Sequence, residues 1–307
     1  MRVLFFIARR LLEFIPVLLA IVTLTFFMVR LAPGGPFDAE KKVLPETQKR
    51  IEEHYHLNAP LYRQYFDYLG GVLHGELGPS FRKSSRSVNE WILLRLPVSL
   101  ELGAYALGVA LLIGLTAGIV SATRPNSWLD HTPMAFAMFG ICIPNFVLGP
   151  LLVLIFASWL GWLPVAGWKT PWHKILPSIT LGAVYAAYIA RLTRAGMLEV
   201  LGQDFIRTAR AKGLSETAVV VKHALRGGLQ PVTAFLGPAT AALLTGSFVV
   251  ETIFLVPGLG REFIEAAFNR DYTMISGTVL VYAALVMTLN LAADVACALL
   301  DPRIRSL

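Results

Sequence analysis

The sequence has few charged residues for its length. Charged side chains account for 15% of its 307 residues, whereas an average soluble domain has about 25%. Hydrophobic residues account for 55%, and the mean hydropathy is +0.61. This composition excludes a disordered chain and a collagen-like repeat. It also argues against a large soluble enzyme, because so few polar residues could not cover so large an apolar core.

Cysteine is nearly absent, since Cys142 and Cys297 are the only two. Two cysteines cannot supply a disulfide scaffold, and these two show no metal-binding spacing. Both fall inside segments that are predicted to span a membrane, where we expect small buried side chains. We therefore predict no metal site.

Motifs for chemistry are missing too. The sequence has no G-x-x-x-x-G-K-[ST] loop for ATP, no H-E-x-x-H, no G-x-S-x-G and no TVGYG filter. Only Asp294 places a carboxylate several residues inside an apolar run, whereas pumps and proton-coupled carriers usually need such groups deep within their helices. A membrane-embedded enzyme and a proton-coupled carrier are therefore the weaker hypotheses. If the chain transports a solute, the energy must come from elsewhere.

Long uncharged runs dominate what is present. A helix needs about 20 apolar residues to cross the hydrocarbon core of a bilayer, and apolar neighbours can extend the shorter runs. The longest run exceeds one crossing, and Trp162, Pro164 and Gly167 near its end indicate a loop. We predict six transmembrane helices, from the runs Phe14–Val29, Leu102–Thr123, Thr132–Trp168, Ile175–Ala190, Gly227–Val250 and Tyr272–Ala293.

The basic residues predict the orientation of these helices. With both termini in the cytoplasm, the inner segments carry 13 Lys and Arg residues and the short outer loops carry 4. Arg9 and Arg10 precede the first run as in a secretory leader, but no small-x-small cleavage site follows, so we expect a retained anchor. The net charge of +7 is thus a signal of topology, and no nucleic acid partner is predicted.

The segment 33–96 carries balanced charge and lies outside the membrane in this topology. We expect two amphipathic helices in it, Glu46 to about Leu57 and Leu61 to Leu73, with Tyr65, Tyr68, Leu69 and Val72 on one face of the second. Such a segment could cap the outer mouth of a pathway or dock a soluble partner. A lid packed on the membrane helices, with no partner, is an equally good interpretation of the spacing.

The largest inner loop, residues 191–229, is the most informative part of the chain. Phe205 to Ala211 is predicted to be a short basic helix, ended by Gly213 in a conformation with positive φ, and Ser215 is expected to cap a second helix. Small Ala209 would let this helix approach a groove on a soluble partner. A basic loop bound to anionic lipid headgroups would have the same composition.

The same loop resembles the coupling helix of permease subunits of ATP-binding-cassette (ABC) importers, a Glu-Ala-Ala-x-x-x-Gly pattern. Gly213 matches its glycine, with Arg207, Thr208 and Ala209 at the first three positions. The form Arg-Thr-Ala-Arg-Ala-Lys-Gly-Leu is typical of the dipeptide/oligopeptide/nickel branch of these permeases. Four further stretches resemble this branch in the right order: residues 9–34, 68–81, 251–260 and 301–305. Within it, the length and the opening Leu-Ala-Pro-Gly-Gly-Pro are most similar to the oligopeptide-permease type.

The resemblance implies a division of labour between subunits. A second, homologous permease would complete the pathway, two cytoplasmic ATPases would bind ATP and Mg²⁺, and an outer peptide-binding protein would deliver the substrate. This chain would bind no cofactor, and no residue is assigned to substrate. Uptake of nickel or another small solute is the alternative within the family. The resemblance assigns contact with an ATPase to Phe205, Arg207, Thr208, Ala209, Arg210, Lys212 and Gly213.

The predicted fold class is therefore all-α: a polytopic protein of a bacterial cytoplasmic (inner) membrane with six transmembrane helices, a type I ABC importer permease. Residues 1–32 would form the inner tail and first helix, and 33–96 an extracytoplasmic helical segment. Residues 97–300 would form a five-helix transmembrane domain that includes the coupling loop 191–229. Residues 301–307 would be a cytoplasmic tail.

Overall fold

The computed structural model describes residues 2–31, 59–80, 82–83, 86–246 and 248–300. The chain is 81% helical, and the described residues contain no strand, only an isolated β-bridge between Pro79 and Ser87. The predicted helix Glu46–Leu57 and the stretch 301–305 lie outside the described residues. The predicted all-α membrane fold is confirmed.

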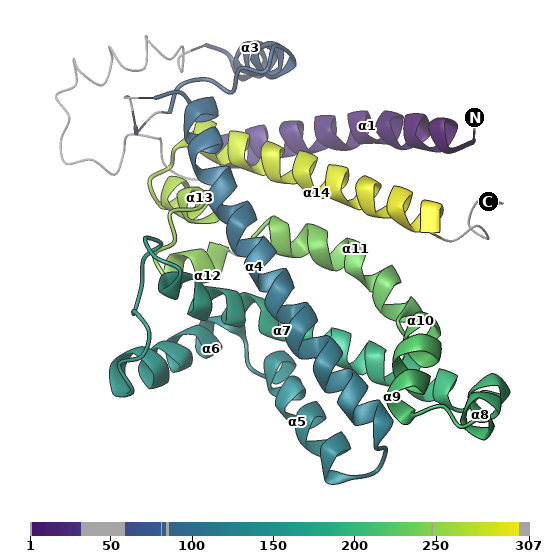
Figure 1. The fold of residues 1–307 in the computed structure, drawn as a ribbon. Helices are drawn as coiled ribbons and strands as arrows, with labels where there is room; N and C mark the ends of the chain where they lie inside the picture. Colours follow the sequence, from purple (N-terminus) through teal and green to yellow (C-terminus); the bar gives the residue numbers. More distant parts are fainter. Residues whose placement is uncertain (1, 32–58, 81, 84–85, 247, 301–307) are drawn as a thin grey trace. The chain divides into compact units, whose positions relative to one another are not determined.

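Figure 1 shows the helices in chain order. They are α1 (Arg2–Leu31), α3 (Leu61–Leu73), α4 (Val88–Thr123), α5 (Trp128–Cys142), α6 (Asn145–Leu152), the π-helix η1 (Val153–Trp159), α7 (Trp172–Leu201), α8 (Asp204–Ala211), α9 (Glu216–Ala218), the π-helix η2 (Val219–Ala224), α10 (Leu225–Gly228), α11 (Gln230–Leu244), α12 (Phe248–Ile253), α13 (Leu259–Phe268) and α14 (Tyr272–Leu300).

Among the described residues, five helical stretches are long and apolar enough to cross a membrane, and a bent pair makes a sixth crossing if it is counted as one. The five are Ile7–Leu31, Val88–Thr123, Trp172–Leu201, Gln230–Ile253 and Tyr272–Val295. The bent pair is Trp128–Cys142 with Asn145–Trp159. All six fall on the predicted uncharged runs.

The bent pair changes direction by 114° between α5 and α6 (Figure 1). Pro144 lies at the break and cannot donate a backbone hydrogen bond, and Ile143 before it is extended, with φ −100° and ψ 116°. The sequence predicts a helix breaker here but not the size of the bend. The second proline of this run, Pro150, lies inside α6, and the chain continues from there as a π-helix.

The structure has two compact units. The first contains residues 1–98 and 257–288. In it, α3 packs on α1: the Thr23 and Tyr65 hydroxyls are 2.8 Å apart, and the Arg30 Nε donates to Gln64 Oε1 at 3.1 Å. The rings of Phe26 and Tyr65 meet edge to face. The predicted helix Leu61–Leu73 is confirmed at both ends.

The second unit contains residues 99–256 and 289–307 and is built around α7, which packs against α5, α6, α10 and α11. Gly114 and Gly118 of α4 press against α7, since a Cβ at Gly118 would come within 2.7 Å of the Ala190 carbonyl oxygen. This Gly-x-x-x-Gly pair therefore lets the backbones of α4 and α7 approach closely.

Two local expectations differ from the structure. Helix α4 begins at Val88, well before the uncharged run, because the Ser87 hydroxyl accepts a hydrogen bond from the Glu90 N–H and caps the helix. Cys142, expected to be buried, is exposed because it is the last residue of α5 before the bend.

Candidate functional site: the coupling loop

The described part of the predicted loop is a sequence of short turns and helices between two membrane-crossing helices. Residues 191–201 belong to α7, which is longer than the uncharged run, so the loop proper begins at Gly202. Helix α8 follows, and Gly213 after it has φ +80°, a conformation that glycine adopts without steric cost. The Ser215 hydroxyl accepts from the Ala218 N–H at 3.4 Å. The predicted short helix, its glycine stop and the serine cap are all confirmed.

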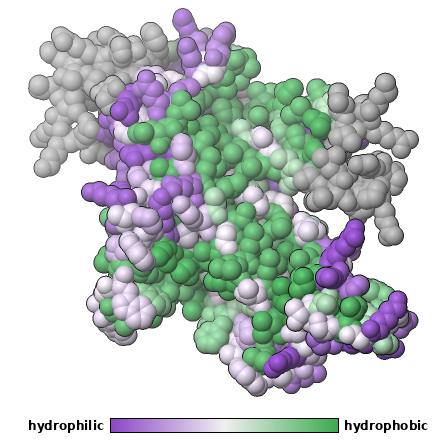
Figure 2. Space-filling model, viewed as in Figure 1, coloured by the Kyte–Doolittle hydropathy of each residue, from purple (hydrophilic) through white to green (hydrophobic). Residues whose placement is uncertain are grey.

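Helix α8 is amphipathic, and its inner face holds it against its own chain. Ile206 is fully buried and Ala209 is 7% exposed, in a cluster with Met197 of α7 and with Val219 and Ala224 of η2. Because Met197 lies on a membrane-crossing helix, these contacts fix α8 to the end of α7. In Figure 2, hydrophilic side chains gather at the lower right, where Figure 1 draws α8.

Six of the seven residues assigned to partner contact lie on the outer face of α8 or the turn after it, and all six are exposed: Phe205, Arg207, Thr208, Arg210, Lys212 and Gly213. The seventh, Ala209, points the other way. We expected Ala209 to let a partner approach, but in the structure its side chain packs within this chain. The helical period places it three residues from Ile206, on the same buried face.

An ion pair closes the turn after α8. The guanidinium of Arg210 donates to both carboxylate oxygens of Glu216, at 2.8 and 3.2 Å. This hydrogen bonding lowers the pKa of the Glu216 carboxyl below its usual value and raises that of Arg210. The two residues are six apart, and the turn at Gly213 brings them together, so helical periodicity could not reveal the pair.

A second ion pair supports the end of α7. The guanidinium of Arg194 donates to both oxygens of Asp130, each at 2.7 Å, and Asp130 also accepts from the Ser121 hydroxyl and the Asn126 N–H. Asp130 is 1% exposed. The pair fixes the turn between α4 and α5 to α7, about two turns before the end of α7. In the sequence, Arg194 is recognisable only as one of the basic residues of the loop 191–229.

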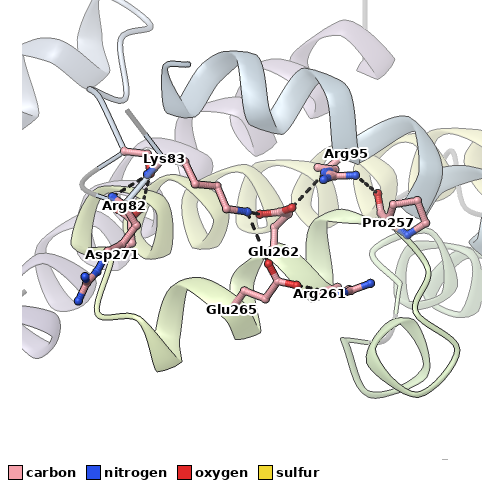
Figure 3. Close-up of polar contacts among 9 residues, drawn as sticks. Arg82, Lys83, Arg95, Pro257, Arg261, Glu262, Glu265 and Asp271 are labelled. Atoms are coloured by element: carbon pink, nitrogen blue, oxygen red, sulfur yellow. Dashed lines mark hydrogen bonds and ion pairs between the residues drawn. The ribbon is translucent and has the colours of Figure 1, made fainter. Parts of the chain in front are cut away.

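The first unit contains its own polar network, between α4 and α13 (Figure 3). Glu262 is 5% exposed and pairs with Lys83 and, at 3.0 Å, with Arg95. Arg95 also donates to the Pro257 carbonyl at 3.4 Å, while Glu265 is 3.5 Å from Lys83. The network joins segments far apart in the sequence.

Asp271 makes a second connection of this kind. Its carboxylate accepts from the Ser80 hydroxyl, from Thr273 Oγ1 at 3.0 Å and from the Met274 N–H at 3.2 Å. Ser80 lies in the stretch 68–81, and Pro257 lies in the stretch 251–260. Because the Lys83 N–H donates to the Ser80 hydroxyl at 2.9 Å, two of the stretches that carry the resemblance contribute to one polar network.

The comparison with known proteins identifies the chain. Residues 114–306 match the family described as binding-protein-dependent transport system inner membrane component. Residues 3–103 match the amino-terminal region of membrane components of the same kind of transport system. The chain belongs to this family. The resemblance to permeases of the dipeptide/oligopeptide branch is confirmed.

Individual relatives cover nearly the whole chain. The oligopeptide transport system permease protein OppB of Haemophilus influenzae is 46% identical over 302 residues, covering 98% of this chain and 99% of that protein. OppB of Escherichia coli K12 is 47% identical with the same coverage. The dipeptide transport system permease protein DppB of Bacillus subtilis is 46% identical over 288 residues, or 94% of each chain.

Solved structures share the fold at much lower identity. The MetNI methionine ABC transporter, in inward facing conformations, matches with a TM-score of 0.54 and 20% identity, over 66% of this chain and 93% of that one. An amino acid ABC transporter matches with a TM-score of 0.51 and 18% identity, over 70% and 94%. These structures support the arrangement of the helices alone.

Proposed function

We propose that this chain is the membrane-spanning permease subunit of an ABC importer that takes up oligopeptides or dipeptides. The observation that carries this is the near-complete match to oligopeptide and dipeptide permeases at 46–47% identity. The chain would form the pathway together with a homologous permease. A peptide-binding protein would deliver the substrate on the outer side, and both termini would lie in the cytoplasm.

In this proposal α8 receives the mechanical input. Two ATPase subunits bind and hydrolyse ATP with Mg²⁺, and one of them contacts the exposed side chains of α8. The inner face of α8 is packed on α7 through Ile206 and Met197, so α8 cannot move far without α7. Closure of the ATPases would then be transmitted to the membrane-crossing helices as a rigid-body motion.

A charge-reversal experiment tests the coupling role. The double variant Arg207→Glu/Lys212→Glu reverses two exposed charges on the contact face, and we expect loss of ATPase co-purification and of ATP-dependent uptake of a labelled peptide into proteoliposomes. The control Arg124→Glu reverses an exposed charge in the α4–α5 turn and should leave both unchanged. Unaltered co-purification and uptake in the double variant would refute this role of α8.

The substrate class needs its own measurement. In proteoliposomes that contain the full assembly, we expect a labelled tripeptide to be taken up only when ATP is enclosed in the vesicle lumen, on the side of the ATPase subunits. Uptake of Ni²⁺ but not of peptide would favour the small-solute alternative. Uptake that follows a proton gradient and persists without ATP would exclude an ABC importer.

A further inference from the structure

A cavity of about 570 Å³ lies beside the coupling helix, within the second unit. It lies between the end of α7, the start of α8, the segment η2–α10 and the start of α11. The volume falls within the range of about 300–1,000 Å³ that is usual for small-molecule sites. Three of its lining residues are basic: Lys222, His223 and Arg226.

These basic groups have no ion-pair partner among the described residues, unlike Arg194 and Arg210 nearby. Lys222 and Arg226 are four residues apart, so consecutive helical turns bring two positive charges together, an arrangement that is mildly unfavourable by itself. Glu199 is the one acidic side chain in the lining. A net positive charge therefore remains in the cavity, and a bound anion would offset the repulsion.

The position of the cavity along the membrane normal indicates which anion is available. Its lining includes the last turns of α7 and the first residues of α11, where two membrane-crossing helices end and begin. Helix α7 has 30 residues, or about 45 Å, close to the roughly 40–45 Å that a bilayer spans when its headgroup regions are included. A helix of this length that crosses along the bilayer normal ends in the headgroup region, and the cavity beside its last turns would then lie at the level of the lipid phosphates.

Its apolar lining suits a lipid as well. Val200, Phe205 and Pro231 contribute to the wall, and Phe205 is 47% exposed. Lys and Arg bind phosphate oxygens through charge-assisted hydrogen bonds. Basic pockets between transmembrane helices on the cytoplasmic side are also known to bind anionic headgroups.

We propose that this cavity binds the phosphate headgroup of an anionic phospholipid through Lys222, His223 and Arg226. A soluble phosphate would offer the same charge, but only a lipid also supplies an apolar chain, which would lie beside Val200 and Pro231 on the membrane-crossing helices. The site would place a lipid against the end of α7, on which α8 packs. The proposal goes beyond the transport function and does not depend on the identity of the transported solute.

Native mass spectrometry of the full chain with its homologous permease tests this. The probes are palmitoyl-oleoyl phosphatidylglycerol, phosphatidylcholine with the same acyl chains, and inorganic phosphate. We expect phosphatidylglycerol to remain bound and phosphatidylcholine to be lost. In Lys222→Gln/Arg226→Gln we expect about a 30-fold loss of phosphatidylglycerol affinity, because each basic group near anionic lipid contributes about fivefold.

The matched control is Arg124→Gln/Arg191→Gln, which removes two exposed charges that do not line the cavity and should retain the lipid. The midpoint of thermal unfolding, measured for each variant and compared with the wild type, tests whether the variant is folded. Equal lipid retention in both double variants, or preferential binding of inorganic phosphate, would overturn the proposal. So would displacement of the lipid by the ATPase subunits, because the cavity would then belong to their interface. None of these measurements uses transport, so a failure of the peptide proposal would be seen separately.

Discussion

The guanidinium of Arg194 and the carboxylate of Asp130 form two parallel hydrogen bonds of 2.7 Å, although the residues are 64 positions apart. The Asp130 side chain is 2% exposed and that of Arg194 31% exposed. Two-point pairing of this kind fixes both the distance and the direction between its elements. Here it fixes the α4–α5 turn to the part of α7 that supports the coupling helix.

Removing one partner of this pair should be costly. We expect Arg194→Leu to destabilise the chain by about 3–5 kcal/mol, because a buried carboxylate is left without its cation. The double variant Asp130→Asn/Arg194→Leu should recover much of this loss. The midpoint of thermal unfolding in detergent, followed by tryptophan fluorescence, measures both. A single variant as stable as the wild type would mean that the pair does not support α7.

Two neighbouring residues of α8 should respond differently to the same substitution. Ala209→Glu places a carboxylate in the buried cluster with Met197 and should lower the unfolding temperature of the isolated chain. Thr208→Glu changes an exposed side chain and should leave that temperature unchanged while weakening ATPase co-purification. If both variants keep wild-type stability, α8 is not packed as described.

The network around Glu262 offers another matched pair. Glu262→Gln removes the negative charge that faces Lys83 and Arg95 at a side chain 6% exposed, and we expect a loss of about 3 kcal/mol. Glu265→Gln, three residues along α13 and 38% exposed, should cost less than about 1 kcal/mol. Equal losses in thermal unfolding would contradict the different burial of the two carboxylates.

The pair Arg210–Glu216 predicts a pH dependence in the turn after α8. Because the folded-state pKa of Glu216 is lowered from its usual 4.5, the pair stabilises the turn above that value. The stabilisation is lost as the pH falls through the lower, folded-state pKa. We expect amide hydrogen exchange in residues 210–218 to be faster in Glu216→Gln than in the wild type at pH 7. The two should converge once the pH lies below the lowered, folded-state pKa of Glu216, and a difference independent of pH would exclude this ion pair.

Much of the fold could be predicted because it depends on local patterns. The uncharged runs coincide with the five membrane-crossing helices and with the bent pair, and helical spacing predicted both ends of α3. Pro144 marked the break between α5 and α6, but its 114° angle depends on packing that no local pattern describes.

In the candidate site too, features with a local sequence signal could be predicted, and features that depend on packing between helices could not. Gly213 and Ser215 have local signals, and both were predicted correctly. The pairing of Asp130 with Arg194 depends on how α5 and α7 pack. The pairing of Lys83 with Glu262 crosses 179 positions, so neither could be derived from spacing. The inward direction of Ala209 was missed because a motif match gives residue types, not the face on which they lie.

The bend at Pro144 also restricts what can surround it. Two helices that stop within a few residues of each other leave backbone N–H and C=O groups without helical partners. Hydrocarbon chains neither donate nor accept hydrogen bonds, and each unsatisfied group there costs several kcal/mol. Wherever Ile143 and Pro144 lie within the depth of the bilayer, their neighbours must be protein or water. At such a depth, the bend would mark one side of the chain from which lipid is excluded.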